Sequence, residues 1–375
     1  MLCAFVCGLF FALSGSYLYT LIANRAVTPE VRPVVYDREQ LANGTIYTTL
    51  GNQQEFNQKY AHQRPYLLEL AADGTLVWSE STESTPFHYQ RLPNGTKVYA
   101  LHDIDSKRWS AHWHVIEPDG SKHIVQSQEI DHTDFHFLLP TPTGEFWVPG
   151  YRLQELEGQK VESLWLELQN QAGEVMQSWD SLSHVSLDST QATETRKYWL
   201  EHDINDYFHG NSATYALDGA LLISARNTNQ IYKVDPQTGE VVWRLGGKDS
   251  DFNIIDDPLG GFSHQHTVSQ LGNGNILLFD NGNLHQPQQS RVVEYQLDEE
   301  AMTATYVWSY TEAGRFSYAA GSAQRLPNGN TFISWGLEVD ESSGKAKITE
   351  VSPLGERVLE IFFAPEVFFY DAFKL

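Results

Sequence analysis

LGNGNILLFD, residues 271–280, joins a tight Asn-Gly turn to an uninterrupted apolar run, and the same arrangement recurs along the chain. Asn-Gly and Asp-Gly pairs favour the positive φ of tight hairpins, so each copy predicts a turn followed by a buried strand. The other copies are LPNGTKVYAL (92–101), TPTGEFWVPG (141–150), ALDGALLISA (216–225) and LPNGNTFISW (326–335).

A second turn, polar with one Gly and followed by a strand that often ends in Trp, alternates with the first. Its copies are AADGTLVWSE (71–80), EPDGSKHIVQ (117–126), NQAGEVMQSW (170–179), PQTGEVVWRL (236–245) and SPLGERVLEI (352–361). One turn of each kind defines a repeated unit, and the six units cover residues 44–80, 88–130, 135–180, 208–247, 264–311 and 317–363. Four-stranded units of this length are typical of a β-propeller.

We therefore expect an all-β fold, a propeller of six four-stranded blades, with a pair of β-sandwiches as the alternative. The C-terminal FFYDAFKL (368–375) is expected to pair with the first blade and close the ring. Within the propeller domain, residues 44–375, the polar stretch 181–207 interrupts the repeat and predicts an insertion before the fourth blade.

The chain begins with an uncharged apolar run of twenty-two residues, 2–23, before Asn24 and Arg25. This length suits a membrane-spanning helix or the core of a signal peptide. We expect residues 1–25 to be a signal peptide or membrane anchor, 26–43 a linker, and the body to be periplasmic or otherwise extracytoplasmic. The only membrane contact expected is through residues 2–23.

Composition restricts the function. Forty-eight acidic and twenty-five basic residues give a net charge of −23, which repels nucleic acid and anionic lipid. Both cysteines, Cys3 and Cys7, lie at the start, so the body has neither a thiol nucleophile nor a cysteine-based metal site.

Histidines recur at one place in the repeat, just before the predicted innermost strand. In four of five aligned units a Phe is followed within two residues by a histidine: His88, His136, His209 and His264. The innermost strands of a propeller surround its central channel, so we expect these imidazoles to converge at one mouth. His266, two residues after His264, would share its strand face. Repeat ancestry is the structural alternative: Phe-x-His as a packing motif copied between blades.

Arg291, in SRVVEY (290–295), adds one cation to the blade that carries His264 and His266. A guanidinium beside imidazoles suits a tetrahedral oxyanion such as sulfate or phosphate. A structural ion pair, with Glu294 or another carboxylate, is the alternative. His264 and His266 with Asp280 or His285 could also suggest a metal site, but no carboxylate has a fixed register with them, and we predict no metal.

These motifs resemble the bacterial arylsulfate sulfotransferase family, which moves sulfuryl groups between phenols without a nucleotide donor. The similarity is carried by FHGNSATYALDGALLISARNTNQIYKVDPQTGEVVWRLGGK (208–248), HQHTVSQLGNGNILLFDNGN (264–283), SRVVEY (290–295) and GSAQRLPNGNTFISWG (321–336). The resemblance implies a six-bladed periplasmic propeller and a two-step reaction through a sulfohistidine in the central channel. It also implies catalytic roles for His209, His266 and Arg291.

We accordingly expect sulfuryl transfer from an aryl sulfate to a phenol, with His266 or His209 as nucleophile and no cofactor. His264, Asn211, Asn281 and Tyr318 are the predicted substrate-binding residues. Phe208, Phe262 and Phe316 could stack on the phenol ring or pack between blades. The chain has no histidine beyond His285, whereas the family uses a further one after the arginine. The alternatives are therefore a propeller that binds an oxyanion or protein partner without catalysis, and a metal-dependent hydrolase.

Overall fold

The structure, a computed structural model, describes residues 29–52, 65–103, 110–130, 132–191, 204–338, 347–364, 367–368 and 370–375. The tight turns form as the sequence predicts. At 271–275 the amide of Leu271 donates to the carbonyl of Asn275 at 2.8 Å, and Gly274 adopts φ 89°. The Asn273 side chain accepts from the Asn275 amide at 3.1 Å, which completes the turn.

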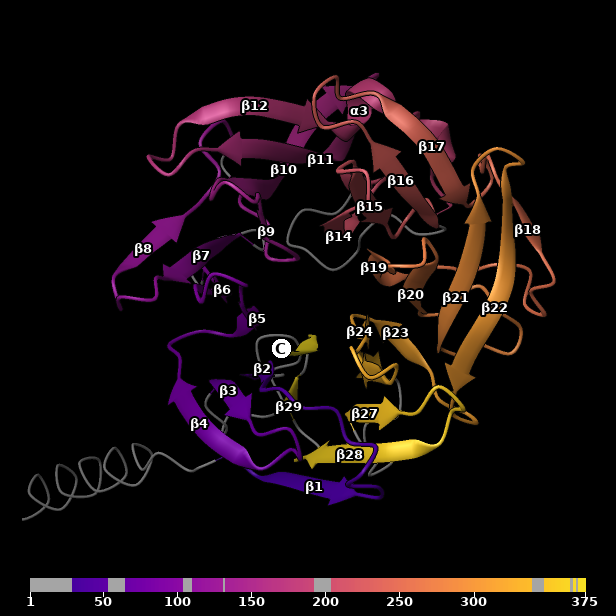
Figure 1. The fold of residues 1–375 in the computed structure, drawn as a ribbon. Coiled ribbons are helices and arrows are strands. Elements are labelled where there is room, and N and C mark those ends of the chain that lie inside the picture. Colours follow the sequence, from indigo (N-terminus) through magenta and orange to yellow (C-terminus); the bar gives the residue numbers. More distant parts are fainter. Residues whose placement is uncertain are drawn as a thin grey trace, which may run out of the picture. The chain divides into compact units, whose positions relative to one another are not determined.

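The strands form six sheets around a common centre (Figure 1), so the fold is the expected six-bladed β-propeller. From the centre outward, blade 1 contains β30 (Ala372–Lys374), β2 (Ile46–Asn52), β3 (Tyr66–Leu70) and β4 (Leu76–Ser81). Blade 2 contains β5 (Pro86–Arg91), β6 (Lys97–His102), β7 (Ala111–Ile116) and β8 (Lys122–Val125). Blade 3 contains β9 (Leu139–Pro140), β10 (Phe146–Leu156), β11 (Gln159–Gln169) and β12 (Val175–Asp180).

The other three blades follow the same order. Blade 4 contains β14 (Gly210–Tyr215), β15 (Leu221–Ala225), β16 (Gln230–Val234) and β17 (Val241–Gly246). Blade 5 contains β19 (His266–Gln270), β20 (Ile276–Asp280), β21 (Arg291–Asp298), β22 (Thr303–Thr311) and β18 (Asn253–Ile255). Blade 6 contains β24 (Ser322–Arg325), β25 (Thr331–Ser334), β27 (Ile348–Val351), β28 (Arg357–Phe363) and β1 (Val31–Val35). Three short strands lie beside these sheets: β23 (Ser317–Ala319) pairs with β26 (Leu337–Glu338), and β29 (Val367–Phe368) pairs with β2.

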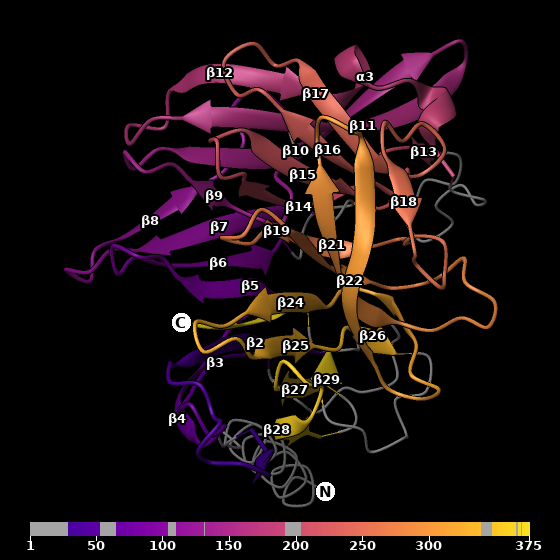
Figure 2. The same cartoon turned by 45° about the vertical axis from the view of Figure 1, so that its right-hand side comes forward.

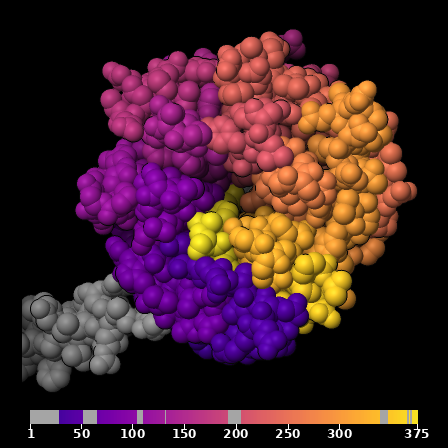
Figure 3. Space-filling view, viewed as in Figure 1, coloured from indigo at the N-terminus to yellow at the C-terminus, as the bar shows by residue number. Residues whose placement is uncertain are grey.

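Both ends of the propeller contribute a strand to closure. As expected from the C-terminal sequence, β30 pairs with β2 in blade 1, with Ile46 opposite Lys374. At the other end, β1 pairs with β28 as the outermost strand of blade 6. Residues 31–35, which the sequence assigned to a linker, are therefore part of the propeller. In the space-filling view the yellow C-terminal residues lie near the centre of the ring (Figure 3).

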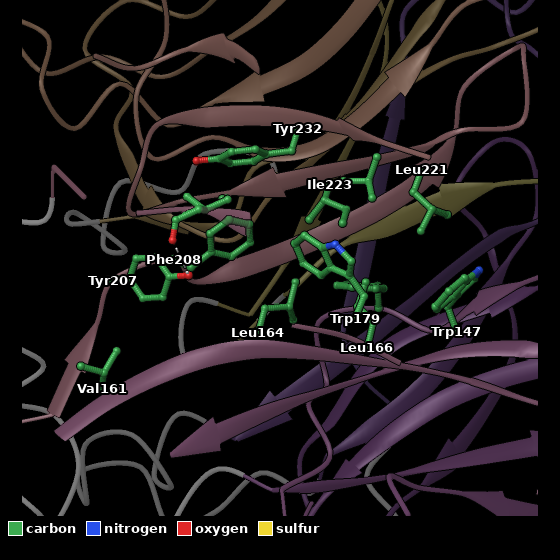
Figure 4. Packing of buried hydrophobic residues seen from close by; sticks show 14 residues of the cluster. Trp147, Val161, Leu164, Leu166, Trp179, Tyr207, Phe208, Leu221, Ile223 and Tyr232 are labelled. Carbon is green, nitrogen blue, oxygen red and sulfur yellow. Dashed lines mark hydrogen bonds between the residues drawn. The ribbon is translucent and has the colours of Figure 1, made fainter. Parts of the chain in front are cut away.

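The core lies between neighbouring blades. Between blades 3 and 4, Trp179, Phe208 and Tyr232 are almost fully buried (Figure 4). The ring centroid of Phe208 lies 6.2 Å from that of Trp179 and 5.1 Å from that of Tyr232. Trp113, Trp243 and Trp335 are buried in the cores of other blades. Large apolar side chains on the facing sides of neighbouring sheets allow the blades to pack face to face.

The insertion begins with a one-turn helix, α3 (Ser181–His184), and a 3₁₀ turn, η1 (Leu187–Ser189). It ends with β13 (Ile204–Asp206), which runs parallel to β11 and pairs with it at Lys160 to Glu162. Figure 2, turned by 45°, shows β13 beside β11 at the edge of blade 3. This short strand matters for the site because it ends in Asp206.

Candidate active site

In blades 2 to 6 the innermost strand begins at the end of the propeller opposite the tight turn that follows it. We call this end of the propeller the histidine end. The non-glycine residues with a left-handed backbone at this end include His88, His209 and His264, with φ 51°, 51° and 54°, and Ala320, with φ 58°. Histidine tolerates this conformation better than most residues do, and such backbone outliers gather at functional sites. The sequence repeat thus places equivalent residues at the histidine end of successive blades.

His136 and His209, two histidines of the repeat, each pair with a carboxylate, and we call each pair a dyad. The two dyads lie against each other. His136 Nδ1 contacts both carboxylate oxygens of Asp134, at 2.7 and 2.9 Å, and His209 Nδ1 lies 2.7 Å from Asp206 Oδ2. The two imidazole rings are edge to face, with centroids 5.0 Å apart. A carboxylate oxygen accepts, so each Nδ1 donates, and each Nε2 carries the lone pair of a neutral ring or the second proton of an imidazolium.

Aromatic rings surround the two imidazoles. Phe135 stacks on His136 at 4.3 Å, and Tyr370 meets both rings edge to face, at 5.7 Å from His136 and 5.9 Å from Phe135. Tyr151 lies nearly parallel to His209 at 6.2 Å. Burial, with the charges of two nearby carboxylates, raises the pKa of Tyr370 well above its usual value, so this phenol stays neutral. The dyads are therefore enclosed by aromatic surface.

Arg226 brings a positive charge to the same place. It follows β15 directly, and its amide donates to the carbonyl of His209 at 2.9 Å. Its guanidinium donates to Asn227 Oδ1 at 2.9 Å and reaches the carbonyl of Tyr318 at 3.4 Å, which spans from blade 4 to blade 6. We refer to Asp134, His136, Asp206, His209 and Arg226 together as the dyad cluster.

His264 and His266 lie within electrostatic range of this cluster. Burial, and then the charge of Arg226, lowers the pKa of His264 to about 3. The same two causes, with smaller effects of His136 and His209, lower the pKa of His266 well below its usual value. Both imidazoles are therefore neutral at physiological pH.

The two neutral histidines differ in their hydrogen bonds. His266 has both ring nitrogens engaged, since Nδ1 contacts Asn281 Oδ1 at 2.7 Å and Nε2 accepts from the Ala320 amide at 3.2 Å. Among the described residues, His264 Nδ1 is buried and has no hydrogen-bond partner. The geometry of His266 is thus that of a bridge between blades 5 and 6, and it differs from the nucleophile that the sequence suggested.

Arg291 also occupies a different place from the one predicted. It is 2% exposed, and all three guanidinium nitrogens are bonded. Nε donates to Asp280 at 2.9 Å, and Nη1 and Nη2 donate to Asp257 at 2.9 and 2.8 Å. Nη2 also donates to the carbonyl of Gly261 at 2.7 Å. Arg291 therefore neutralises two buried carboxylates, and the ion-pair alternative raised by the sequence describes it, although the partners are not Glu294.

The predicted substrate-binding residues are likewise dispersed. Asn211 is buried and donates to the carbonyl of Gln265 at 2.7 Å, so it ties blade 4 to blade 5. Asn281 is fully buried, where it holds His266 and donates to the carbonyls of Ser317 and Ala320. Only Tyr318 is exposed, at 40%.

Other residues that the sequence singled out are structural. Phe208 and Phe262 are buried in the cores between blades, which is the packing role. His88 contacts Asp371 through Nδ1 at 2.7 Å and Gln90 through Nε2 at 3.0 Å, so both of its nitrogens are engaged.

Sequence reasoning missed three members of the dyad cluster: Asp134, Asp206 and Arg226. Two of them carried a local signal, because Asp134 stands two residues before His136 and Asp206 three before His209. A carboxylate at this offset can reach back to its own imidazole. Arg226 stands directly after the apolar strand LLISA and carried no signal that separated it from a surface arginine.

In the described ranges, no group of three or more His, Cys, Asp or Glu side chains is arranged to hold a metal ion. No helix among those residues combines the length and apolar character needed to cross a membrane, and the apolar run 2–23 lies outside them.

Fold and site define a six-bladed propeller in which four innermost strands begin beside imidazoles, and the carboxylate pairs of two of these imidazoles, His136 and His209, lie against each other. The chain belongs to the arylsulfotransferase (ASST) family, whose model matches residues 100–364. No functionally curated protein matches the sequence.

Several solved structures are similar to this chain. One is a protein of unknown function from Bacteroides caccae, with 12% identity and a TM-score of 0.55 over 88% of this chain and 98% of the other. A periplasmic gluconolactonase from Pseudomonas aeruginosa has 11% identity and a TM-score of 0.46 over 87% and 99%. Virginiamycin B lyase from Staphylococcus aureus has 9% identity and a TM-score of 0.43 over 89% and 88%. At these identities the likeness concerns the fold alone.

Proposed function

We propose that the dyad cluster catalyses sulfuryl transfer from an aryl sulfate to a phenol, through a sulfated histidine. The observation that carries this proposal is the pair His136 and His209, whose ring centroids are 5.0 Å apart and whose Nδ1 atoms each contact a carboxylate. Arg226, from the same blade as His209, donates its backbone amide to the His209 carbonyl. Family membership supports the same reaction class. Metal chemistry is not needed for it, because imidazole is both nucleophilic when neutral and a good leaving group when sulfated.

His209 is the proposed nucleophile. Its Nε2 attacks sulfur, an N–S bond forms, and the S–O bond to the aryl group breaks. The positive charge that develops on the ring is stabilised by Asp206 through Nδ1, as in other His–carboxylate pairs. His209 is preferred to His136 because its side chain is the more exposed, 13% against 7%, and because Arg226 is bonded to its backbone.

His136 is the proposed acid and base. It enters the first step as an imidazolium, and its Nε2 gives a proton to the leaving phenolate oxygen; in the second step the neutral Nε2 takes a proton from the acceptor phenol and the imidazolium is restored. The acceptor oxygen then attacks sulfur, the N–S bond breaks, and neutral His209 is restored. Arg226 neutralises the sulfuryl oxygens as they pass between the two phenols. The proton balance over both steps is zero.

Aromatic walls support a phenolic substrate. Phe135 is half-buried against His136, and Tyr151 runs along His209, so flat apolar surfaces flank both imidazoles. A phenyl ring between such surfaces gains offset stacking and leaves its oxygen toward the dyads. We also propose that the protein acts outside the cytoplasm, with residues 2–23 as its signal or anchor.

The test uses the purified full-length chain with 4-nitrophenyl sulfate and excess phenol, without nucleotide, and follows 4-nitrophenolate. We expect release that depends on phenol and is unaffected by a chelator. His209→Ala should lower kcat by about 10³-fold or more, and His136→Ala and Arg226→Ala by about 10²- to 10³-fold. His123→Ala is the matched control, because its side chain is 47% exposed on β8 of blade 2.

Three results would count against the proposal. Release that a chelator abolishes would assign the chemistry to a metal hydrolase. Full activity in His209→Ala would exclude that residue as nucleophile, and the mass of an intermediate trapped without phenol would show where the sulfuryl group resides. Saturable binding of aryl sulfates by a folded protein that turns none over would identify an oxyanion-binding propeller.

A further inference from the structure

Asn227 lies between Asp206 and Arg226, two members of the dyad cluster. It lies in the turn Arg226–Asn229, which connects β15 to β16 at the histidine end, and it is 5% exposed. Its Nδ2 donates to the backbone carbonyl of Asp206 at 2.5 Å and to the carboxylate Oδ2 at 3.3 Å. Its Oδ1 accepts from Arg226 Nη1 at 2.9 Å. One amide thus bonds the dyad carboxylate on one side and the guanidinium on the other.

The backbone of Asn227 is held as firmly as its side chain. Its amide donates to the carbonyl of Phe208 at 3.1 Å, and its carbonyl accepts from the amide of Gln191 at 2.7 Å. Gln191 belongs to the insertion, which also supplies Asp206 at its other end. The turn therefore joins both described ends of the insertion to blade 4.

The last residue of the turn extends this arrangement to blade 5. Asn229 has a left-handed φ of 55°, and its Oδ1 accepts from the backbone amide of His264 at 2.7 Å. Its Nδ2 donates to Gln191 Oε1 at 2.6 Å. The four residues Arg226–Asn229 consequently contact the residues that precede the innermost strands of blades 4 and 5.

We propose that Asn227 is a positioning residue that sets the distance between the Arg226 cation and the His209–Asp206 dyad. This inference rests on the proposed function, because it assigns the two partners their roles in sulfuryl transfer. Asn227 bonds neither imidazole, so it acts through Asp206 and Arg226. Asparagine is suited to the task because its short side chain offers a donor and an acceptor at once.

Other side chains at position 227 lack one of these properties. Leucine has nearly the same shape but no hydrogen bonds, so Asp206 and Arg226 lose their common partner. Aspartate would still accept from Arg226, but its carboxylate would face the carboxylate of Asp206 at close range. Each substitution therefore separates a bonding role from a space-filling one.

The first measurement is independent of turnover. Histidine labelled with ¹⁵N reports whether Nδ1 or Nε2 carries the ring proton, and the His209 signal is assigned by its loss in His209→Gln. The wild-type chain should show His209 protonated at Nδ1 and bonded to Asp206. In Asn227→Leu we expect a mixture of tautomers, because Asp206 is no longer held toward the ring. Asn273→Ala is the matched control, because Asn273 is an exposed asparagine in a tight turn, at the end of the propeller opposite the histidine end.

The second measurement is kinetic. Asn227→Leu should lower kcat/KM by about 10- to 100-fold, a range seen when residues that orient a reactive group are lost. Asn227→Asp should lose kcat and shift the acidic limb of the pH–kcat profile, because a second carboxylate faces Asp206. Combining Asn227→Leu with Arg226→Ala should cost no more than about threefold beyond the worse single variant, since both remove one coupled unit.

The outcomes separate the two proposals. A folded Asn227→Leu chain with wild-type kcat/KM, or with an unchanged His209 tautomer, overturns the positioning role. A fully multiplicative loss in the double variant does the same. If the wild-type chain turns over no aryl sulfate while Asn227→Leu still changes the His209 tautomer, the proposed function fails and the positioning of the dyad by Asn227 stands.

Discussion

Replacing Arg291 with alanine should damage stability and leave the chemistry of the folded protein intact. The guanidinium is 2% exposed and bonds two carboxylates, Asp257 and Asp280, that have no accessible side-chain surface. Removing one member of a buried ion pair costs about 3–5 kcal/mol, because its partner is left charged without compensation. Against a typical free energy of unfolding of about 5–15 kcal/mol, the variant stays folded but weakened.

The loss should depend on pH with a defined sign. Burial raises the pKa of Asp257, but bonds from Arg291 and Tyr295 outweigh it and hold this pKa below its usual value. A lowered pKa in the folded state stabilises the protein above the unfolded-state pKa of about 3.9, and this is lost as pH falls. In Arg291→Ala the largest of the interactions that lower this pKa is lost, so the pKa of Asp257 rises, and the stability gained as Asp257 ionises above about pH 4 becomes smaller. The gap between wild type and variant should therefore be smallest near pH 4 and largest at pH 7.

Urea unfolding followed by tryptophan fluorescence measures the gap, with Arg226→Ala as the opposite case. Arg226 is partly exposed, so water screens its contacts, and its loss should change the free energy of unfolding by about 1 kcal/mol or less. An Arg291→Ala chain that unfolds at the wild-type urea concentration yet has lost sulfuryl transfer would refute this reasoning and return Arg291 to the reacting group.

Three further effects are expected. Lys374→Met should lower the free energy of unfolding by about 3–5 kcal/mol, because it leaves Glu350 buried without the cation 2.7 Å away; Lys374→Met with Glu350→Leu should recover part of the loss in urea titrations. Gly282→Ala should lower the urea midpoint strongly, since its φ is +71° and a Cβ would lie 2.0 Å from the carbonyl oxygen of Gln289; an unchanged midpoint would show that the turn can move. Because the pKa of His264 is lowered to about 3, the unfolded chain binds its proton first, so wild-type stability should fall as pH drops from about 6.5 toward 3; the fall should be shallower in His264→Gln, and equal slopes would contradict the burial of this ring.

The blades could be predicted from sequence because their signals are local. The turn at 271–275 needs only an asparagine side chain, a glycine with positive φ and the apolar run that follows. Five copies of that chemistry place five hairpins without knowledge of their neighbours. Closure was predicted at the C-terminal end for a similar reason, but β1 was not, since VRPVV carries no turn signal and its partner β28 is more than 320 residues away.

The candidate site could be predicted only in part. The recurring Phe-x-His pattern brought His88, His136, His209 and His264 to the histidine end, because equivalent positions in repeats occupy equivalent places. The pattern could not predict the hydrogen-bond partners of each imidazole, and therefore which imidazoles take part in catalysis. That depends on partners such as Asp371 for His88, 283 residues away, and the Ala320 amide for His266.

The amino-acid sequence by itself thus determined the repeat, the six blades and the residue types at the histidine end, since each follows from backbone preferences within a few residues. Only the tertiary structure decided the roles. Arg291 and Arg226 are both arginines close to apolar strands in sequence, yet one is enclosed by Asp257 and Asp280, whereas the other bonds Asn227, which also bonds Asp206. A side chain's charge acts over a few ångströms of space, and the neighbours within that distance are set by how the blades pack.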